Sequence, residues 1–265
     1  MSEVRTAAVN GIEMDYCRFG KGSKIFVMLP GLSVKSVMLS ADAVEEAYGM
    51  FSKDYTVYLF DRRKNLPETY SVYEMAEDTA IVMEYLGLKK TCMFGASQGG
   101  MMAQVIAIRH PELVERLVIG SSSSEIPSDV DSPLSEWIRL AEEKECEKLN
   151  LAFAKRVYPE AVAEAYHDFF IEDARTIRDE DLKRFVILAK GTEGFNVTEQ
   201  LKKIECPVLI LGSNDDRVLG GEASLRIKQE LCDREDVECF MYDGYGHAAY
   251  DTAPDYKERL MKFFG

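Results

Sequence analysis

The sequence predicts an α/β protein: a mostly parallel sheet with helices on both faces. Apolar strand-like runs alternate with helix-like segments through the first half of the chain and again near its end. Such alternation is typical of parallel strands joined by helical crossovers. Between these parts, residues 125–195 have helical spacing and no convincing strand. We therefore expect one domain over residues 1–265, with a helical cap inserted at 125–195.

Each expected element follows from a local pattern. Apolar, β-rich runs that end in turn residues predict strands at 24–31, 55–61, 90–95, 116–121, 206–216 and 237–244. Apolar residues at helical intervals predict helices at 71–87, 101–109, 220–232 and 253–265. The helix at 101–109 should end before Pro111, because the residue before a proline is pushed out of helical conformation.

Composition limits the classes of partner. The formal charge of −14 opposes binding to nucleic acid or an anionic membrane, because like charges repel. No apolar run approaches the roughly 18 residues of a membrane helix. The first ten residues lack the pattern of a signal peptide, so we expect a cytoplasmic protein. The six cysteines form no CxxC pair, and we expect no metal and no cofactor.

The stretch "FGASQGG", residues 94–100, places glycines around Ser97, between a predicted strand and a predicted helix. Alone, a G-x-S-x-G pattern is a weak signal, but this position is the one that a nucleophile elbow requires. The sharp turn forces the serine to a positive φ and brings two backbones together, where side chains at Gly95 and Gly99 would collide. The amides of Gln98 and Gly99 then begin a helix whose partial positive charge suits an oxyanion.

A serine hydroxyl needs a neighbouring base to become a nucleophile. Of the three histidines, His110 lies at a helix end and His167 lies within the predicted helical insertion, where surface or packing roles are favoured. His247 instead follows a strand and two glycines in "DGYGHAAY". We predict that His247 is the general base.

The base needs an acid that fixes its tautomer. The segment "LILGSNDD" carries adjacent aspartates at the end of a predicted strand, of which we favour Asp215 over Asp216. Glu125 and Asp129 are remoter alternatives.

At this point the chain resembles the α/β-hydrolase superfamily over nearly its whole length. The resemblance rests on "FVMLPGLSVKS", "YLFDRR", "FGASQGGMMAQ", "HPELVERLVIGSSSS", "IECPVLILGSNDD" and "GYGHAAY". The order serine, acid, histidine is the order of that family. The resemblance implies that Ser97 is the nucleophile, Asp215 the acid and His247 the base.

The resemblance also implies an oxyanion hole built from the backbone amides of Leu32 and Gln98. The sequence departs from the family at this turn, where Pro30 stands in place of the histidine of many relatives. Because the donor is a main-chain N–H, this departure does not remove the oxyanion hole. The sequence does not determine the geometry of the turn.

These roles predict a serine hydrolase, with a small-molecule acyl substrate, that cleaves a small or medium apolar ester or thioester through an acyl-enzyme. Candidate pocket residues are Met101, Trp137, Phe153, Phe169, Phe170 and Phe185. Alternatives with the same triad are a carbon–carbon bond hydrolase and an aminopeptidase. A non-catalytic ligand-binding module is the remaining alternative.

Overall fold

The computed structural model describes residues 3–127 and 132–265. Its centre is an eight-stranded sheet, within these residues, of order β1-β2-β4-β3-β5-β6-β7-β8. The strands are β1 Glu3–Val9, β2 Ile12–Gly20, β3 Lys24–Leu29, β4 Tyr55–Arg63, β5 Thr91–Ala96, β6 Val114–Gly120, β7 Val208–Ser213 and β8 Val237–Tyr242. β2 pairs antiparallel with β1 and β4, and all other pairs are parallel. The predicted fold class is confirmed.

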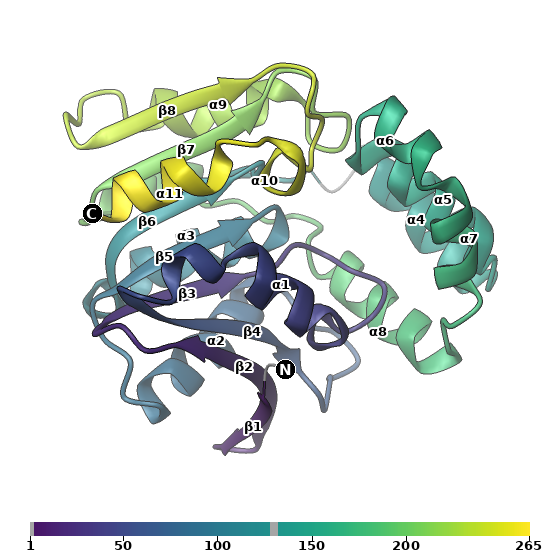
Figure 1. Ribbon diagram of the computed structural model, residues 1–265, viewed down its shortest axis with the longest axis horizontal. Coiled ribbons are helices and arrows are strands. Elements are labelled where there is room, and N and C mark those ends of the chain that lie inside the picture. Colours follow the sequence, from purple (N-terminus) through teal and green to yellow (C-terminus); the bar gives the residue numbers. More distant parts are fainter. Residues whose placement is uncertain (1–2, 128–131) are drawn as a thin grey trace.

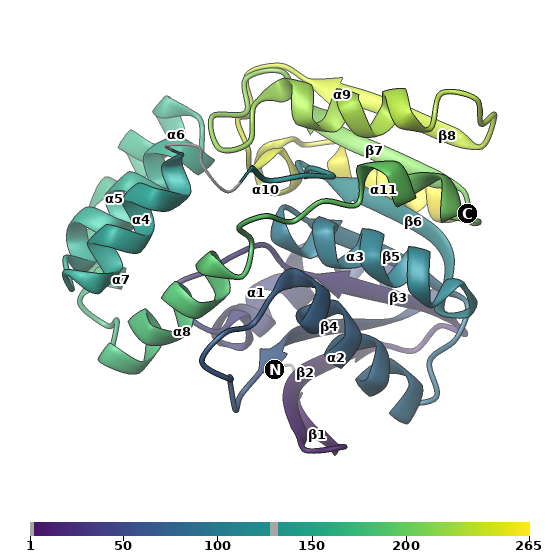
Figure 2. The same cartoon turned by 180° about the vertical axis from the view of Figure 1, so that it is seen from behind.

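Helices cover both faces of the sheet (Figures 1 and 2). α1 and α11 pack on one face, and α2, α3 and α9 pack on the other. The helices are α1 Ala41–Ala47, α2 Val72–Tyr85, α3 Gln98–Arg109, α4 Pro133–Glu142, α5 Cys146–Val157, α6 Glu160–Ala165, α7 His167–Ala174, α8 Asp179–Lys190, α9 Gly221–Glu230, α10 Ala249–Thr252 and α11 Tyr256–Phe264. Short 3₁₀ helices are η1 Val37–Ser40, η2 Gly49–Phe51, η3 Pro111–Leu113 and η4 Thr198–Lys203.

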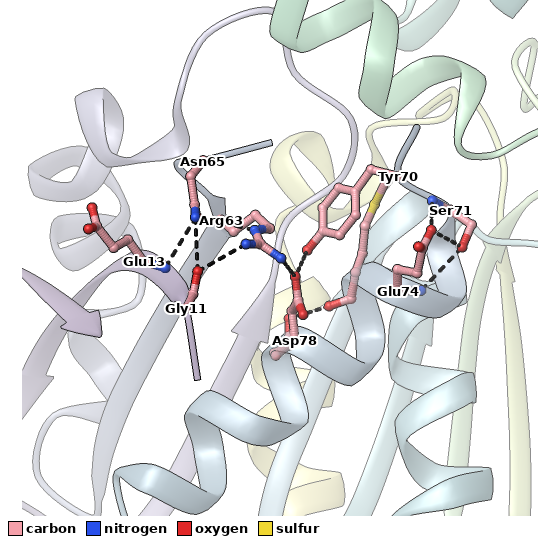
Figure 3. Close-up of polar contacts among 10 residues, drawn as sticks. Gly11, Glu13, Arg63, Asn65, Tyr70, Ser71, Glu74 and Asp78 are labelled. Carbon is pink, nitrogen blue, oxygen red and sulfur yellow. Dashed lines mark hydrogen bonds and ion pairs between the residues drawn. The ribbon is translucent and has the colours of Figure 1, made fainter. Parts of the chain in front are cut away.

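No strand was predicted before residue 24, yet β1 and β2 form a hairpin there. Its turn residues Asn10 and Gly11 have φ of 51° and 77°, the positive values that a tight hairpin needs. Figure 3 shows how Arg63, the last residue of β4, fastens this turn by donating to the Gly11 carbonyl at 3.1 Å and to Asp78 of α2 at 3.1 Å. Tyr70 donates to the same carboxylate at 2.7 Å. The network joins the hairpin, β4 and α2.

The helices α4 to α8 lie between β6 and β7 in the chain and stand together at one side of the sheet (Figures 1 and 2). We call them the helical insertion. Apolar residues of α4, α5 and α8 form its own core, which also contacts Val34 and Ala248 of the sheet domain. An antiparallel bridge between Glu125 and Asn196 brings the two ends of the insertion together. Within the described ranges, no helix is long and apolar enough to cross a membrane.

Candidate active site

Ser97 lies in a strained turn between β5 and α3. Its φ of 52° and ψ of −119° fall outside the regions that residues with a Cβ normally adopt. Backbone hydrogen bonds hold this conformation, because the Ser97 amide donates to the Gly120 carbonyl at 2.8 Å and the Ser97 carbonyl accepts from the Gly100 amide at 2.9 Å. Ser122 Oγ also donates to that carbonyl at 2.7 Å. The surroundings therefore fix the position of the Ser97 side chain.

The glycines around Ser97 are required by close backbone contacts. A Cβ on Gly95 would lie 2.3 Å from the Gly99 carbonyl oxygen, and one on Gly99 would lie 2.0 Å from the Leu29 carbonyl oxygen. A Cβ on Gly31 would lie 3.3 Å from Ser97 Cβ. The loop that follows β3 therefore lies directly against the serine turn.

His247 and Asp216 form a buried pair. Their side chains are 3% exposed each, and His247 Nδ1 lies 2.8 Å from Asp216 Oδ2. Asp216 Oδ1 accepts from the backbone amides of Val218 at 2.8 Å and Leu219 at 3.0 Å. Burial opposes ionisation of Asp216, but His247 and these two amides outweigh it, so the pKa of Asp216 lies below its usual value.

The prediction that Asp215 contacts His247 is wrong. Asp215 is exposed, and it accepts from Ser213 Oγ at 2.8 Å and from the amides of Gly244 at 3.0 Å and Gly246 at 3.1 Å. It therefore braces the loop that carries His247 and does not reach the imidazole. Asp215 and Asp216 lie in a tight turn after β7, where the side chains of adjacent residues point in different directions. The sequence motif does not show which of the two points toward His247.

Ser97, His247, Leu32 and Gln98 all line one pocket of about 300 Å³. Three of the predicted pocket residues, Met101, Trp137 and Phe153, line it as well. The other described lining residues are Gly31, Ser123, Glu125, Ile126, Pro127, Ser132, Pro133, Leu134, Val157, Thr192, Val218, Leu219, Glu222, Ala223, Arg226 and Tyr250. The pocket thus lies between the sheet domain and the helical insertion.

The other three predicted pocket residues are elsewhere. Phe169 is 61% exposed on α7, and Phe170 packs beside it. Phe185 is fully buried in the core of the helical insertion. None of the three lines the pocket. Helical spacing places an apolar residue on one face of a helix, but it does not show whether that face is covered, or by which neighbour.

Comparison with known proteins agrees with this fold. A family model described as "alpha/beta hydrolase fold" matches residues 25–144. The chain is 25% identical over 221 residues to the human "Serine hydrolase BPHL", covering 79% of this chain and 69% of that protein. It is 27% identical over 265 residues to the "2-hydroxy-6-oxononadienedioate/2-hydroxy-6-oxononatrienedioate hydrolase" of a Pseudomonas species, covering 92% and 89%.

Among solved structures, MGS-M2, an α/β-hydrolase enzyme from a Medee basin deep-sea metagenome library, superposes with a TM-score of 0.86. The superposition covers 98% of this chain and 97% of that one at 19% identity. The chain therefore has the α/β-hydrolase fold. Together with the named relatives, this fold supports a hydrolytic enzyme.

The sequence did not predict the polar groups behind the serine turn. Arg62, which is 3% exposed, donates to Gln98 Oε1 at 2.8 Å. Gln98 Nε2 donates to the Leu188 carbonyl at 2.8 Å and to Thr192 Oγ1 at 2.8 Å, both in or next to α8. The signal available in the sequence was an arginine directly after a buried strand, in "YLFDRR". A charge in that position needs partners within the fold.

One group of described side chains has spacing suited to a cation. Ligand atoms of Glu84, His110 and Glu112 lie within 4.8 Å of one another. His110 Nε2 also lies 2.9 Å from Glu77 Oε2, so this ring nitrogen already has a carboxylate partner. None of these residues lines the pocket that holds Ser97 and His247.

Proposed function

We propose that the protein is a serine hydrolase that cleaves a small or medium apolar ester or thioester through an acyl-enzyme on Ser97. His247 is the general base and Asp216 is the acid that orients it. The observation that carries the proposal is the buried His247–Asp216 pair, which opens onto the same pocket as the strained Ser97. The Nδ1 contact to a carboxylate leaves Nε2 for the serine proton.

In the proposed reaction, Ser97 Oγ attacks the carbonyl carbon as its proton passes to His247 Nε2. The carbonyl oxygen becomes an oxyanion, which the backbone amides of Leu32 and Gln98 stabilise by hydrogen bonding. Collapse of this intermediate expels the alcohol or thiol, which takes the proton from His247. Water then gives a proton to His247 and attacks the acyl carbon, and Ser97 leaves with that proton.

Apolar lining supports an apolar acyl substrate. Trp137 of α4 and Phe153 of α5 pack together with ring centroids 4.5 Å apart and face the pocket from the helical insertion, which we propose acts as the cap. On the opposite side the sheet domain supplies Met101, Val218 and Leu219. A pocket of about 300 Å³ is at the small end of ligand sites, which favours a short acyl chain.

A fluorophosphonate probe tests the proposal, because it labels only an activated serine. We expect the wild-type protein to react at Ser97, identified by mass spectrometry of the labelled peptide, and the Ser97→Ala variant to remain unlabelled. The wild type should also hydrolyse p-nitrophenyl butyrate, with the rate lost in Ser97→Ala. Equal labelling of the two proteins, or none in either, would contradict the proposal and favour a non-catalytic binding module.

Carbon–carbon bond hydrolysis is the second candidate, because the Pseudomonas relative named for a dienedioate substrate covers 92% of this chain. Charge in the pocket argues against so anionic a substrate. Arg226 is the cationic side chain among the described lining residues, and Glu125 forms an ion pair with it, while Glu222 adds a second carboxylate. An aminopeptidase would instead cleave amino-acid p-nitroanilides. Faster turnover of a dienedioate or a p-nitroanilide than of the butyrate ester would replace the ester assignment.

A further inference from the structure

Arg62 lies behind the serine turn as a buried cation. It is the second-to-last residue of β4, and it is 3% exposed. Its Nη2 donates to the Pro30 carbonyl at 2.7 Å and to Gln98 Oε1 at 2.8 Å, and it lies 3.5 Å from the Gly31 carbonyl. A buried charge is costly unless hydrogen bonds compensate for it. Here the partners include two segments that the proposed reaction uses.

The first segment is the loop after β3. The Gly31 carbonyl and the Leu32 N–H belong to one planar peptide, in which the two groups point in opposite directions. A donor on the carbonyl side therefore favours an N–H that faces away from Arg62. The shorter bond to Pro30 fixes the peptide that precedes it. Arg62 thus bonds the two carbonyls that precede Leu32 and holds this turn.

The second segment is the start of α3. The Gln98 side chain accepts from Arg62 and donates to Leu188 and Thr192, so both ends of its amide group have partners. Gln98 is 2% exposed, and the same residue supplies the second proposed amide donor. Fixing this side chain restricts rotation of the backbone at the end of the serine turn. One guanidinium therefore connects the two donor-bearing segments.

We propose that Arg62 is a positioning residue that aligns the Leu32 and Gln98 amides on the oxyanion and adds its buried positive charge behind them. This inference rests on the proposed serine hydrolase function. Burial lowers the pKa of Arg62 to about 10, outweighing the neighbouring Asp61, so the group is still cationic at neutral pH. Preorganised charge next to a developing oxyanion acts more strongly in the transition state than in the bound substrate.

The test compares Arg62→Gln and Arg62→Lys with Arg63→Gln. Arg63 is the next residue of β4, but it bonds Asp78 and Gly11 in place of Pro30 and Gln98, and it does not line the pocket (Figure 3). Each variant is assayed for kcat and KM with p-nitrophenyl butyrate. Each is also titrated with an alkyl trifluoromethyl ketone, whose adduct with Ser97 carries an oxyanion.

We expect Arg62→Gln to lower kcat on the order of tenfold to a hundredfold with KM nearly unchanged, below the roughly 10²–10³ of a lost donor. Ketone affinity should fall by a similar factor. Arg62→Lys keeps the positive charge but loses the planar guanidinium with its several donors. Its kcat and ketone affinity should lie between those of Arg62→Gln and wild type. Arg63→Gln should lower the melting temperature without changing kcat or ketone affinity.

If Arg62→Gln does not fold, Gln98→Leu replaces it, because that variant keeps the backbone amide of residue 98 and removes the side-chain acceptor of Arg62 on α3. The same loss in kcat and in ketone affinity is then expected. Unchanged kcat in the Arg62 variants, or a lower kcat with full ketone affinity, would overturn the inference while leaving the proposed function intact. Absence of fluorophosphonate labelling in wild type would instead overturn the proposed function itself.

Discussion

Asp215 and Asp216 are adjacent carboxylates in different surroundings. Asp216 is buried against His247 and accepts two further amides, whereas Asp215 is exposed and accepts from the loop at Gly244 and Gly246. A buried carboxylate next to an imidazole fixes the tautomer that leaves Nε2 free. We expect the exposed one to act only by holding the loop.

Asp216→Asn should therefore abolish most of the activity. An asparagine can donate to Nδ1 and so favours the wrong tautomer of His247. The expected loss in kcat is about 10⁴-fold, as in other serine triads, with a folded protein by circular dichroism. Kinetics with p-nitrophenyl butyrate give the measurement. A loss smaller than that of Asp215→Asn would contradict the assignment.

Asp215→Asn is the matched control, and its main effect should be on stability. Burial opposes ionisation of Asp215, but Ser213 Oγ and the loop amides outweigh it and lower its pKa. A carboxylate with a lowered pKa in the folded state contributes stability at neutral pH that is lost as pH falls through that pKa. The melting temperature of Asp215→Asn should thus lie below wild type at pH 7 and approach it near pH 3.

The sequence allowed Ser97 and His247 to be proposed, because a glycine-flanked corner and a histidine after a strand are each rare in this chain. The choice of Asp215 over Asp216 was wrong, because both follow the same strand and the sequence does not show which of them faces His247. Arg62 was missed for a different reason: its partners Pro30 and Gln98 are 32 and 36 residues away in the sequence. Only the fold brings them together.

At the scale of elements, the close packing of β3, β5 and α3 determines the position of Ser97. Gly95 and Gly99 allow the strand and helix backbones to approach within a distance that leaves no room for a Cβ. Gly95→Ala should destabilise the fold by at least about 2 kcal/mol, because the contact is with backbone that cannot rotate away. Thermal unfolding should show a fall of several degrees, and fluorophosphonate labelling should slow.

Gly49→Ala provides the comparison. Gly49 is exposed in η2, and an added Cβ there meets no atom within 4 Å. Its melting temperature should stay close to that of wild type. Equal destabilisation by the two alanines would show that the close contact at the serine turn is not the cause.

Parallel strands were predictable because buried strands read as continuous apolar runs. The β1–β2 hairpin was not, because β1 is exposed at five of its seven positions and only partly covered at a sixth, and so lacks an apolar run. The helices of the insertion were expected as a group. Their packing against one another depends on contacts between distant residues, which periodicity does not encode.

At the scale of the whole molecule, polar contacts join the helical insertion to the sheet domain around the pocket. Arg184 of α8 pairs with the buried Asp61 at the end of β4, and Lys35 in the loop after β3 pairs with Asp173 of α7. Ser36 Oγ donates to Asp61 at 2.5 Å. The loop that carries Leu32 is therefore held between the two parts of the molecule.

Because the insertion forms one wall of the pocket, its aromatic residues should set the length of the acyl chain. Phe153→Ala removes a ring that packs on Trp137 and should enlarge the pocket. We expect the ratio of kcat/KM for p-nitrophenyl octanoate to that for the butyrate to rise about tenfold, since each buried CH₂ is worth about 0.8 kcal/mol and only part of the longer chain gains contact.

Phe169→Ala is the control for this substitution, because Phe169 is 61% exposed on α7 and does not line the pocket. It removes the same atoms from the same helical insertion and should leave the chain-length profile unchanged. An identical shift in both variants would mean that the insertion acts through its overall stability. No shift in Phe153→Ala would mean that the acyl chain binds against the sheet domain, along Met101, Val218 and Leu219.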